Sequence, residues 1–124
     1  MGRHATFLGR ITDEEKKVLF GAASAVLIPS IVEPFGIVAL EAMAARKPIV
    51  ATRVGGLVEI LSSEANSTFV DPGNVKQIEE SLVRVLSEKS IELDPKTNSS
   101  AKLDRFDLER MVNSYVDLYR KTKD

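Results

Sequence analysis

Short apolar runs alternate along the chain with longer segments whose apolar residues recur at helical spacing. An uninterrupted apolar run of four or five residues is typical of a strand buried on both faces, as in a parallel sheet. Parallel strands in turn need helical crossovers between them. The alternation therefore predicts an α/β fold with a parallel sheet flanked by helices. The predicted strands are Ala5–Gly9, Ala25–Ile28, Pro48–Thr52 and Thr68–Val70.

Helix signals separate these runs. Thr12 with Glu15 three residues later forms a capping-box pattern, which predicts a helix from Thr12 towards Ala25. Gly55-Gly56 reads as a backbone turn. Polar composition predicts a loop over Ser90–Ser100. The other predicted helices are Phe35–Arg46, ended by Lys47-Pro48, then Leu57–Ser62, Val75–Glu88 and Leu103–Lys121.

Composition excludes several classes of function. The chain has 124 residues, which fits one domain, and its net charge of −1 gives no electrostatic reason to bind nucleic acid. It has no cysteine and a single histidine, His4, so neither a thiolate metal site nor a Ser–His–Asp triad can form. No apolar run approaches the roughly 20 residues that span a bilayer. We expect a cytoplasmic protein without a thiolate or histidine-rich metal site.

The segment Pro29–Ala44 carries the strongest chemical signal. It follows a predicted parallel strand, and open α/β sheets bind ligands at the carboxyl ends of their strands. Pro34 suits the first position of a helix. The amides of Phe35, Gly36 and Ile37 would then be unpaired helix-start donors, and Gly36 would allow close approach. Such a helix start attracts an anion, for example a diphosphate.

Two carboxylates flank this predicted anion site. Glu33 precedes the helix, and Glu41 lies about two turns into it. Because a carboxylate only accepts hydrogen bonds, either could bind hydroxyls of a sugar or a ribose. A plainer interpretation makes Glu33 a charged helix cap and Glu41 a solvated helix residue. From these residues alone the plainer interpretation is favoured.

Taken as a unit, the pattern closely resembles the signature of family 4, or group 1, glycosyltransferases. Glu33 and Glu41 are separated by seven residues, with Phe35-Gly36 between them and Leu40-Glu41-Ala42-Met43 around the second. That family comprises retaining enzymes of the GT-B fold, such as glycogen and sucrose synthases. Further resembling blocks occur in the expected order: Phe7–Arg10, Leu27–Ser30, Pro48–Thr52, Gly55-Gly56 and Phe69–Gly73.

The resemblance implies a donor site for a UDP-, GDP- or ADP-linked hexose, without metal or cofactor. Glu33, the catalytic candidate, would hold hydroxyls of the donor sugar. Amides of Phe35, Gly36 and Ile37 would meet the distal phosphate and the sugar. Glu41 would bind the ribose hydroxyls, with the backbone of Leu40 near the ribose and phosphates. Arg10 would lie near the base.

The resemblance also implies that residues 1–124 form one partial Rossmann-like domain, the second part of the GT-B C-terminal domain. Nothing in the sequence matches the acceptor domain or the Arg–Lys pair that neutralises the donor diphosphate, so we expect the chain alone to be inactive. The missing N-terminal half of the enzyme or a second copy would be its partner. Ala5–Gly9 would either pair directly beside Ala25–Ile28 or exchange into a swapped dimer.

Two alternatives remain open. One is a non-catalytic nucleotide-binding or interaction module that kept the fold and lost the reaction. The other is a flavodoxin-like regulator unrelated to sugars, which would need a cluster of acidic residues at the strand ends; the sequence shows no such cluster.

Overall fold

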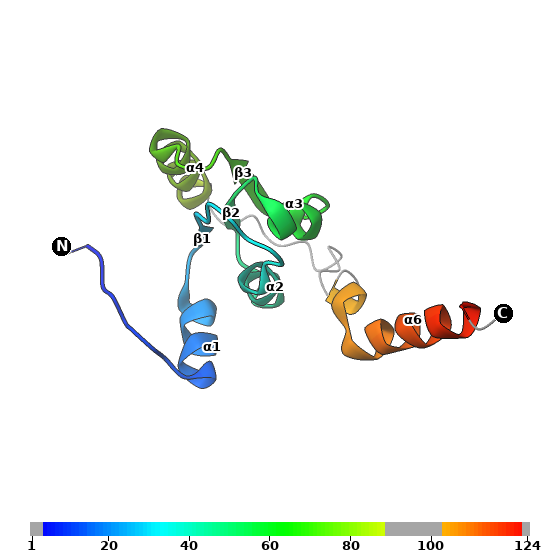
Figure 1. The fold of residues 1–124 in the computed structure, drawn as a ribbon. Coiled ribbons are helices and arrows are strands. Elements are labelled where there is room, and N and C mark those ends of the chain that lie inside the picture. The colour runs from blue at the N-terminus through cyan, green and yellow to red at the C-terminus, as the bar shows by residue number, and fades with distance from the viewer. Residues whose placement is uncertain (1–3, 89–102, 123–124) are drawn as a thin grey trace.

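The computed structural model describes residues 4–88 and 103–122. Figure 1 shows the chain from its N-terminus to its C-terminus. The elements in order are α1 (Asp13–Ala22), β1 (Val26–Ile28), α2 (Ile37–Ala44), β2 (Ile49–Thr52), α3 (Gly55–Leu61), β3 (Ser67–Val70), α4 (Val75–Ser87), the 3-10 helix η1 (Asp104–Phe106) and α6 (Leu108–Lys121).

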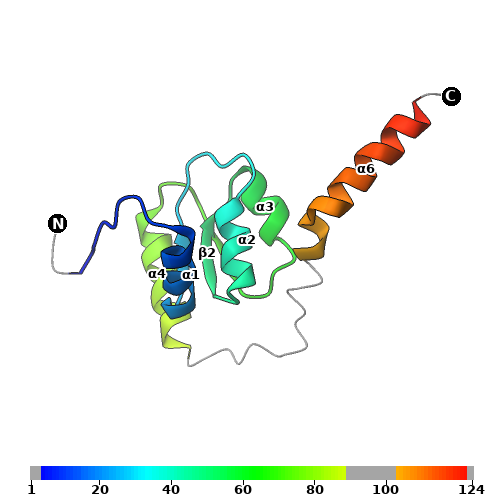
Figure 2. The same ribbon diagram turned by 90° about the horizontal axis from the view of Figure 1, so that it is seen from below.

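The three strands form one parallel sheet in the order β1-β2-β3. Val26 lies opposite Ile49 on one side of β2, and Ile49 lies opposite Ser67 on the other. α2 and α4 lie on opposite sides of β2 in both views (Figures 1 and 2). The predicted α/β class, a Rossmann-like parallel sheet flanked by helices, is confirmed.

The core lies between the sheet and helices α2 and α3. The central strand β2 is buried along its whole length, as its continuous apolar run predicts. The buried apolar side chains that surround it are Ile28, Ala39, Ala42, Met43, Leu57, Ile60 and Leu61. Small residues on α2 let this helix approach the sheet closely, which fixes the position of the segment that precedes it.

The run Ala5–Gly9, predicted as a strand, is not one. Its residues are exposed, with Phe7 79% and Leu8 55% accessible, and it pairs with no strand of the described residues. The expectation that it pairs directly beside β1 is therefore wrong. β1 is only three residues long, so an added edge strand would gain few ladder hydrogen bonds there. A swapped dimer stays a prediction.

Several predicted helix boundaries also shift. α2 ends at Ala44 because Arg46 adopts a left-handed conformation (φ 54°), and the amides of Arg46 and Lys47 bond back to Met43 and Ala42 in a Schellman motif. The Gly55-Gly56 pair opens α3 rather than forming a separate turn. The last helix is divided at Asp107, whose side chain caps α6. The predicted loop Ser90–Ser100 lies outside the described residues.

Helix α6 extends away from the sheet in both views (Figures 1 and 2). None of its residues is buried. The link to the body runs through η1, where the Phe106 ring meets that of Phe35 edge-on with 6.2 Å between centroids. The C-terminal segment therefore touches the loop that carries the predicted site.

Candidate donor-binding site

The loop between β1 and α2, residues 29–36, lies at the carboxyl end of the parallel sheet. Thr52, the last residue of β2, is fully buried, and its hydroxyl donates to the carbonyls of Ile28 (3.3 Å) and Ser30 (2.5 Å). These bonds tie the end of the central strand to the start of the loop. The loop is thus held at the edge of the sheet where open α/β folds bind their ligands.

Gly55 and Gly56 fix the other half of the loop. The amide of Gly56 donates to the Glu33 carbonyl over 2.9 Å. A Cβ atom on Gly55 would lie 2.1 Å from that carbonyl oxygen, and one on Gly56 would lie 2.2 Å from the Phe35 carbonyl oxygen. Only residues without a side chain allow α3 to start this close to the loop backbone. The pair was predicted to form a turn, but it instead packs closely against the backbone of Glu33 and Phe35.

The Glu33 side chain folds back onto the helix start. Its Oε1 accepts a hydrogen bond from the Gly36 amide over 3.0 Å, and the residue is half-buried. Gly36 is buried, has φ +96° and is the N-cap of α2. Pro34 is therefore not the first helical residue, and the expectation that the Gly36 amide is unpaired is wrong. A glycine is needed there because the chain must turn through the left-handed region.

The other predicted contacts of the diphosphate lie at the same helix start. Phe35 and Ile37 are both exposed, and among the described residues neither of their amides donates a hydrogen bond. Leu40, one turn further along, is partly buried and packs against the core. Two of the three predicted amide donors at the start of α2 are therefore without a hydrogen-bond acceptor among the described residues.

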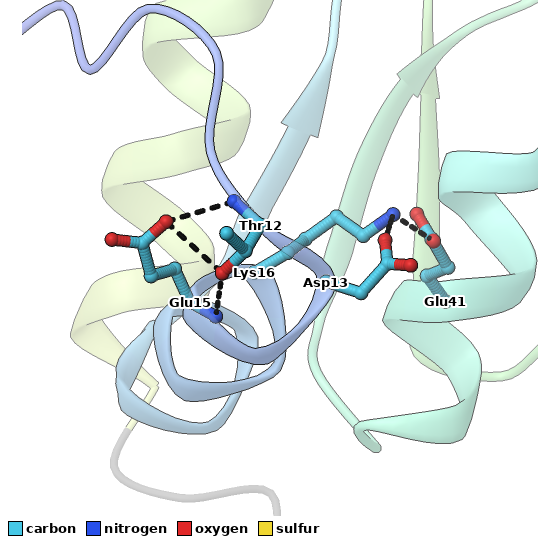
Figure 3. A network of polar contacts seen from close by, with 5 residues as sticks. All are labelled: Thr12, Asp13, Glu15, Lys16 and Glu41. Carbon is cyan, nitrogen blue, oxygen red and sulfur yellow. Dashed lines mark hydrogen bonds and ion pairs between the residues drawn. The ribbon is translucent and has the colours of Figure 1, made fainter.

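Glu41 lies on α2 about one turn after its start rather than two, because the helix begins at Ile37. Its Oε1 forms an ion pair with Lys16 Nζ of α1 over 2.6 Å. The same Nζ lies 3.4 Å from Asp13 Oδ1, so Lys16 stands between two carboxylates (Figure 3). The hydrogen bond that the Lys16 ammonium donates to Glu41, followed by the one it donates to Asp13, raises the pKa of Lys16.

Sequence reasoning missed Lys16. It lies 25 positions before Glu41, on a different helix, and no motif links the two. Thr12 and Glu15 offered the only signal, because their capping box fixes where α1 starts and hence which of its residues face α2. That box is present: Glu15 Oε2 accepts from the Thr12 amide over 2.8 Å, and the Glu15 amide donates to Thr12 Oγ1 over 3.2 Å (Figure 3).

A half-open cavity of about 650 Å³ lies between α1 and α2 beside this ion pair. Phe20 and Ala44 contribute apolar surface to it, and Lys17 and Lys47 contribute charge. Lys47 Nζ donates to the Gly21 carbonyl over 2.8 Å, so it joins the other end of α1 to the body rather than being a solvated charge. Glu41 thus borders a cavity large enough for a small ligand.

Comparison with known proteins decides the family. The family described as glycosyl transferases group 1 matches residues 1–103. This chain belongs to the group 1 glycosyltransferases. The match includes the loop, α2 and the Gly55-Gly56 pair, which together build the site described above.

Related glycosyltransferases cover most of the chain but are much longer. An uncharacterized glycosyltransferase of Methanocaldococcus jannaschii is 49% identical over 69% of this chain and 22% of its own length. A D-inositol 3-phosphate glycosyltransferase of Corynebacterium urealyticum is 32% identical over 97% of the chain and 28% of its own length. Sucrose-phosphate synthase 4 of Arabidopsis thaliana is 34% identical over 71% of the chain and 8% of its own length. This chain thus spans less than a third of the length of each of these relatives.

The described part of this glycosyltransferase chain offers no group of three or more His, Cys, Asp or Glu side chains that could hold a metal ion. Within residues 4–88 and 103–122, no helix is long and apolar enough to cross a bilayer. Arg10, expected near the base, is exposed ahead of α1. Arg53 lies over the Phe69 ring at 4.7 Å from its centroid, and Glu59 is exposed on α3.

Proposed function

We propose that this chain is the donor-binding part of a nucleotide-sugar-dependent glycosyltransferase that transfers a hexose with retention of anomeric configuration. The observation that carries the proposal is the start of α2. It lies at the carboxyl end of the sheet and has Glu33 on one side and Glu41 one turn further on. The amides of Phe35 and Ile37 there have no hydrogen-bond acceptor among the described residues. Accessible amides at a helix start favour a diphosphate, and carboxylates favour hydroxyls.

In this proposal, the diphosphate of a UDP-, GDP- or ADP-hexose binds the amides of residues 35–37, near the backbone of Leu40. Glu33 accepts hydrogen bonds from hydroxyls of the sugar, and Glu41 accepts them from the ribose. Glu33 Oε1 accepts a hydrogen bond from the Gly36 amide. The sugar and phosphate therefore compete with a local bond, and donor binding releases Glu33 towards the sugar. The hydrogen bond between Glu33 and the Gly36 amide is part-buried. Breaking it therefore costs little free energy only if the Glu33 carboxylate and the Gly36 amide both form new hydrogen bonds with the donor.

The activity of the whole protein needs parts that this chain does not contain. The relatives are three or more times longer, and they include enzymes named for inositol phosphate and sucrose phosphate. We propose that the chain by itself binds donor without transferring it, since its sequence has no match to the Arg–Lys pair that the family resemblance implies for the departing diphosphate. An N-terminal half or a second copy, through a swapped Ala5–Gly9 segment, would complete the site, in the cytoplasm.

A non-catalytic nucleotide-binding or interaction module is the second candidate. One observation favours it: both signature acids have partners within the chain, Glu33 with Gly36 and Glu41 with Lys16. Such a module would keep a nucleotide site and show no transfer even when joined to the rest of a glycosyltransferase.

A thermal-shift titration with UDP, GDP and ADP, and with their glucose and mannose conjugates, tests the donor site. The glycosyltransferase proposal expects stabilisation by one base, with its sugar conjugate stabilising more than the bare diphosphate. Glu41→Ala should abolish the shift, while Glu59→Ala, an exposed acid on α3, should leave it unchanged. A folded protein that responds to none of these ligands would reject the proposal.

The two candidates differ in one further experiment. The chain is joined to, or mixed with, the N-terminal half of a related glycosyltransferase, and transfer from the donor selected above is measured. Transfer that Glu33→Gln removes supports the enzyme. Tight donor binding without transfer supports the module.

A further inference from the structure

Lys16 is the cation that the fold brings to Glu41. Lys16 Nζ lies 2.6 Å from Glu41 Oε1, the shortest ion pair among the described residues. Both side chains keep some access to solvent, 37% for Lys16 and 29% for Glu41. The pair is therefore neither sealed in the core nor fully solvated, and a ligand can reach it.

The contact leaves hydrogen-bonding capacity on Glu41. Only Oε1 has a partner in the described part of the chain, whereas a carboxylate has two oxygens with about four acceptor positions. Figure 3 shows Lys16 reaching Glu41 from α1, alongside Asp13. The second oxygen of Glu41 can accept from a vicinal pair of hydroxyls without breaking the ion pair.

We propose that Lys16 is a positioning residue for Glu41, which holds the carboxylate in one rotamer so that it selects a ribose over a deoxyribose. The inference rests on the proposed function, since it assigns a role within the same donor site. A charged acceptor that is held in place makes stronger hydrogen bonds to hydroxyls than a mobile one.

If Lys16 had a purely structural role, its substitution would have a different effect on nucleotide binding. Lys16 could simply tie α1 to α2, since Glu41 lies on α2. The chain offers a matched control, because Lys47 also lines the cavity and also ties α1 to the body, through the Gly21 carbonyl, without touching Glu41. A residue that acts only as a tether should behave as Lys47 does.

The experiment is calorimetric titration of the full chain with UDP, GDP and ADP and with their 2′-deoxy counterparts. The readout is the ratio of the two dissociation constants for the base that binds. The variants are Lys16→Met, Lys16→Gln, Lys16→Arg and Lys47→Met, each checked for folding by circular dichroism. Lys16→Gln removes the charge but keeps a polar end group, and it supplies the test if Lys16→Met does not fold.

We expect Lys16→Met and Lys16→Gln to weaken binding of the ribonucleotide about tenfold, as a charge-assisted contact is replaced, and to bring the ratio close to one. Lys16→Arg should keep most of the wild-type preference for the ribonucleotide, and Lys47→Met should leave the ratio of dissociation constants as in wild type. An unchanged ratio in both neutral Lys16 variants, or an equal loss in Lys47→Met, overturns the role of Lys16 while the donor site stands. If wild type binds none of the nucleotides, the proposed function fails and this inference fails with it.

Discussion

Substitution of Gly56 by alanine tests how the loop of the candidate site is held. The new Cβ would lie 2.2 Å from the carbonyl oxygen of Phe35 and 2.5 Å from its carbonyl carbon, where real Cβ atoms essentially never come under 3.0 Å. Both neighbours are backbone atoms, so no side-chain rotation can relieve the clash. The loop or the start of α3 must therefore move by about an ångström.

The cost of this movement can be estimated. Inserting a methyl group into a packed region costs about 1–3 kcal/mol. The hydrogen bond from the Gly56 amide to the Glu33 carbonyl, now 2.9 Å, would lengthen and lose part of its roughly 1 kcal/mol. For a domain of this size each kcal/mol corresponds to roughly 4 °C in Tm. We expect Gly56→Ala to lower Tm by roughly 5–15 °C.

Thermal unfolding followed by circular dichroism at 222 nm measures the effect, with Gly21→Ala as control. Gly21 lies inside α1, and a Cβ there would meet no atom within 4 Å. Alanine is the better helix former, so this control should raise stability by about 0.5–1 kcal/mol. If Gly56→Ala is as stable as wild type, or rises as Gly21→Ala does, α3 does not start against the loop as described.

Other expected outcomes concern the core, the helix cap and the contact between Phe35 and Phe106. Leu57→Ala, at a fully buried site, should cost about 2–5 kcal/mol in urea unfolding; a cost below 1 kcal/mol would contradict its place in the core. Thr12→Ala should cost about 1 kcal/mol by loss of the α1 cap, an effect that chemical denaturation of both proteins can resolve. Bonds from the Thr12 amide and then its hydroxyl lower the pKa of Glu15, so the capping contribution is present above the usual glutamate range and lost as pH falls through the lowered pKa. The difference in Tm between wild type and Glu15→Gln should therefore narrow on acidification below pH ~4 and not on going to pH 8. Phe106→Ala should loosen the C-terminal segment, seen as faster proteolysis after it, whereas Phe106→Tyr should not.

Local patterns in the sequence predicted local structure well. The Thr12–Glu15 spacing fixed the start of α1, and continuous apolar runs located β1, β2 and β3 to within a residue or two. These features depend on contacts between residues close in the chain, which a sequence displays directly. The fold class followed from their alternation.

Features that depend on distant contacts were missed or misplaced. Ala5–Gly9 has a strand-like composition, yet a strand exists only where a neighbour offers its backbone. The first turn of α2 was assigned to Pro34 because the left-handed Gly36 cannot be read from a single sequence. The close approach of Gly56 to Phe35 and the pairing of Lys16 with Glu41 join different elements, and neither leaves a local signature.

In the candidate site, too, the features set by local sequence were predicted and those set by distant contacts were not. The segment that carries it, residues 29–44, was identified from its spacing of glutamates and glycine and from its place after a parallel strand. Which amides stay accessible could not be foreseen, since the Glu33 side chain takes the Gly36 amide. The cationic side of the site, formed by α1, emerged only from the packing of two helices.

Backbone amide NMR of the labelled chain, titrated with UDP, GDP and ADP, tests the central claim most directly, because it reports each amide separately. If the start of α2 is the diphosphate site, one of these nucleotides should produce saturable shifts that are largest at Phe35, Gly36 and Ile37, with a further shift at Glu41. Largest shifts in α4 or α6, or no saturable shift with any of the three, would contradict it.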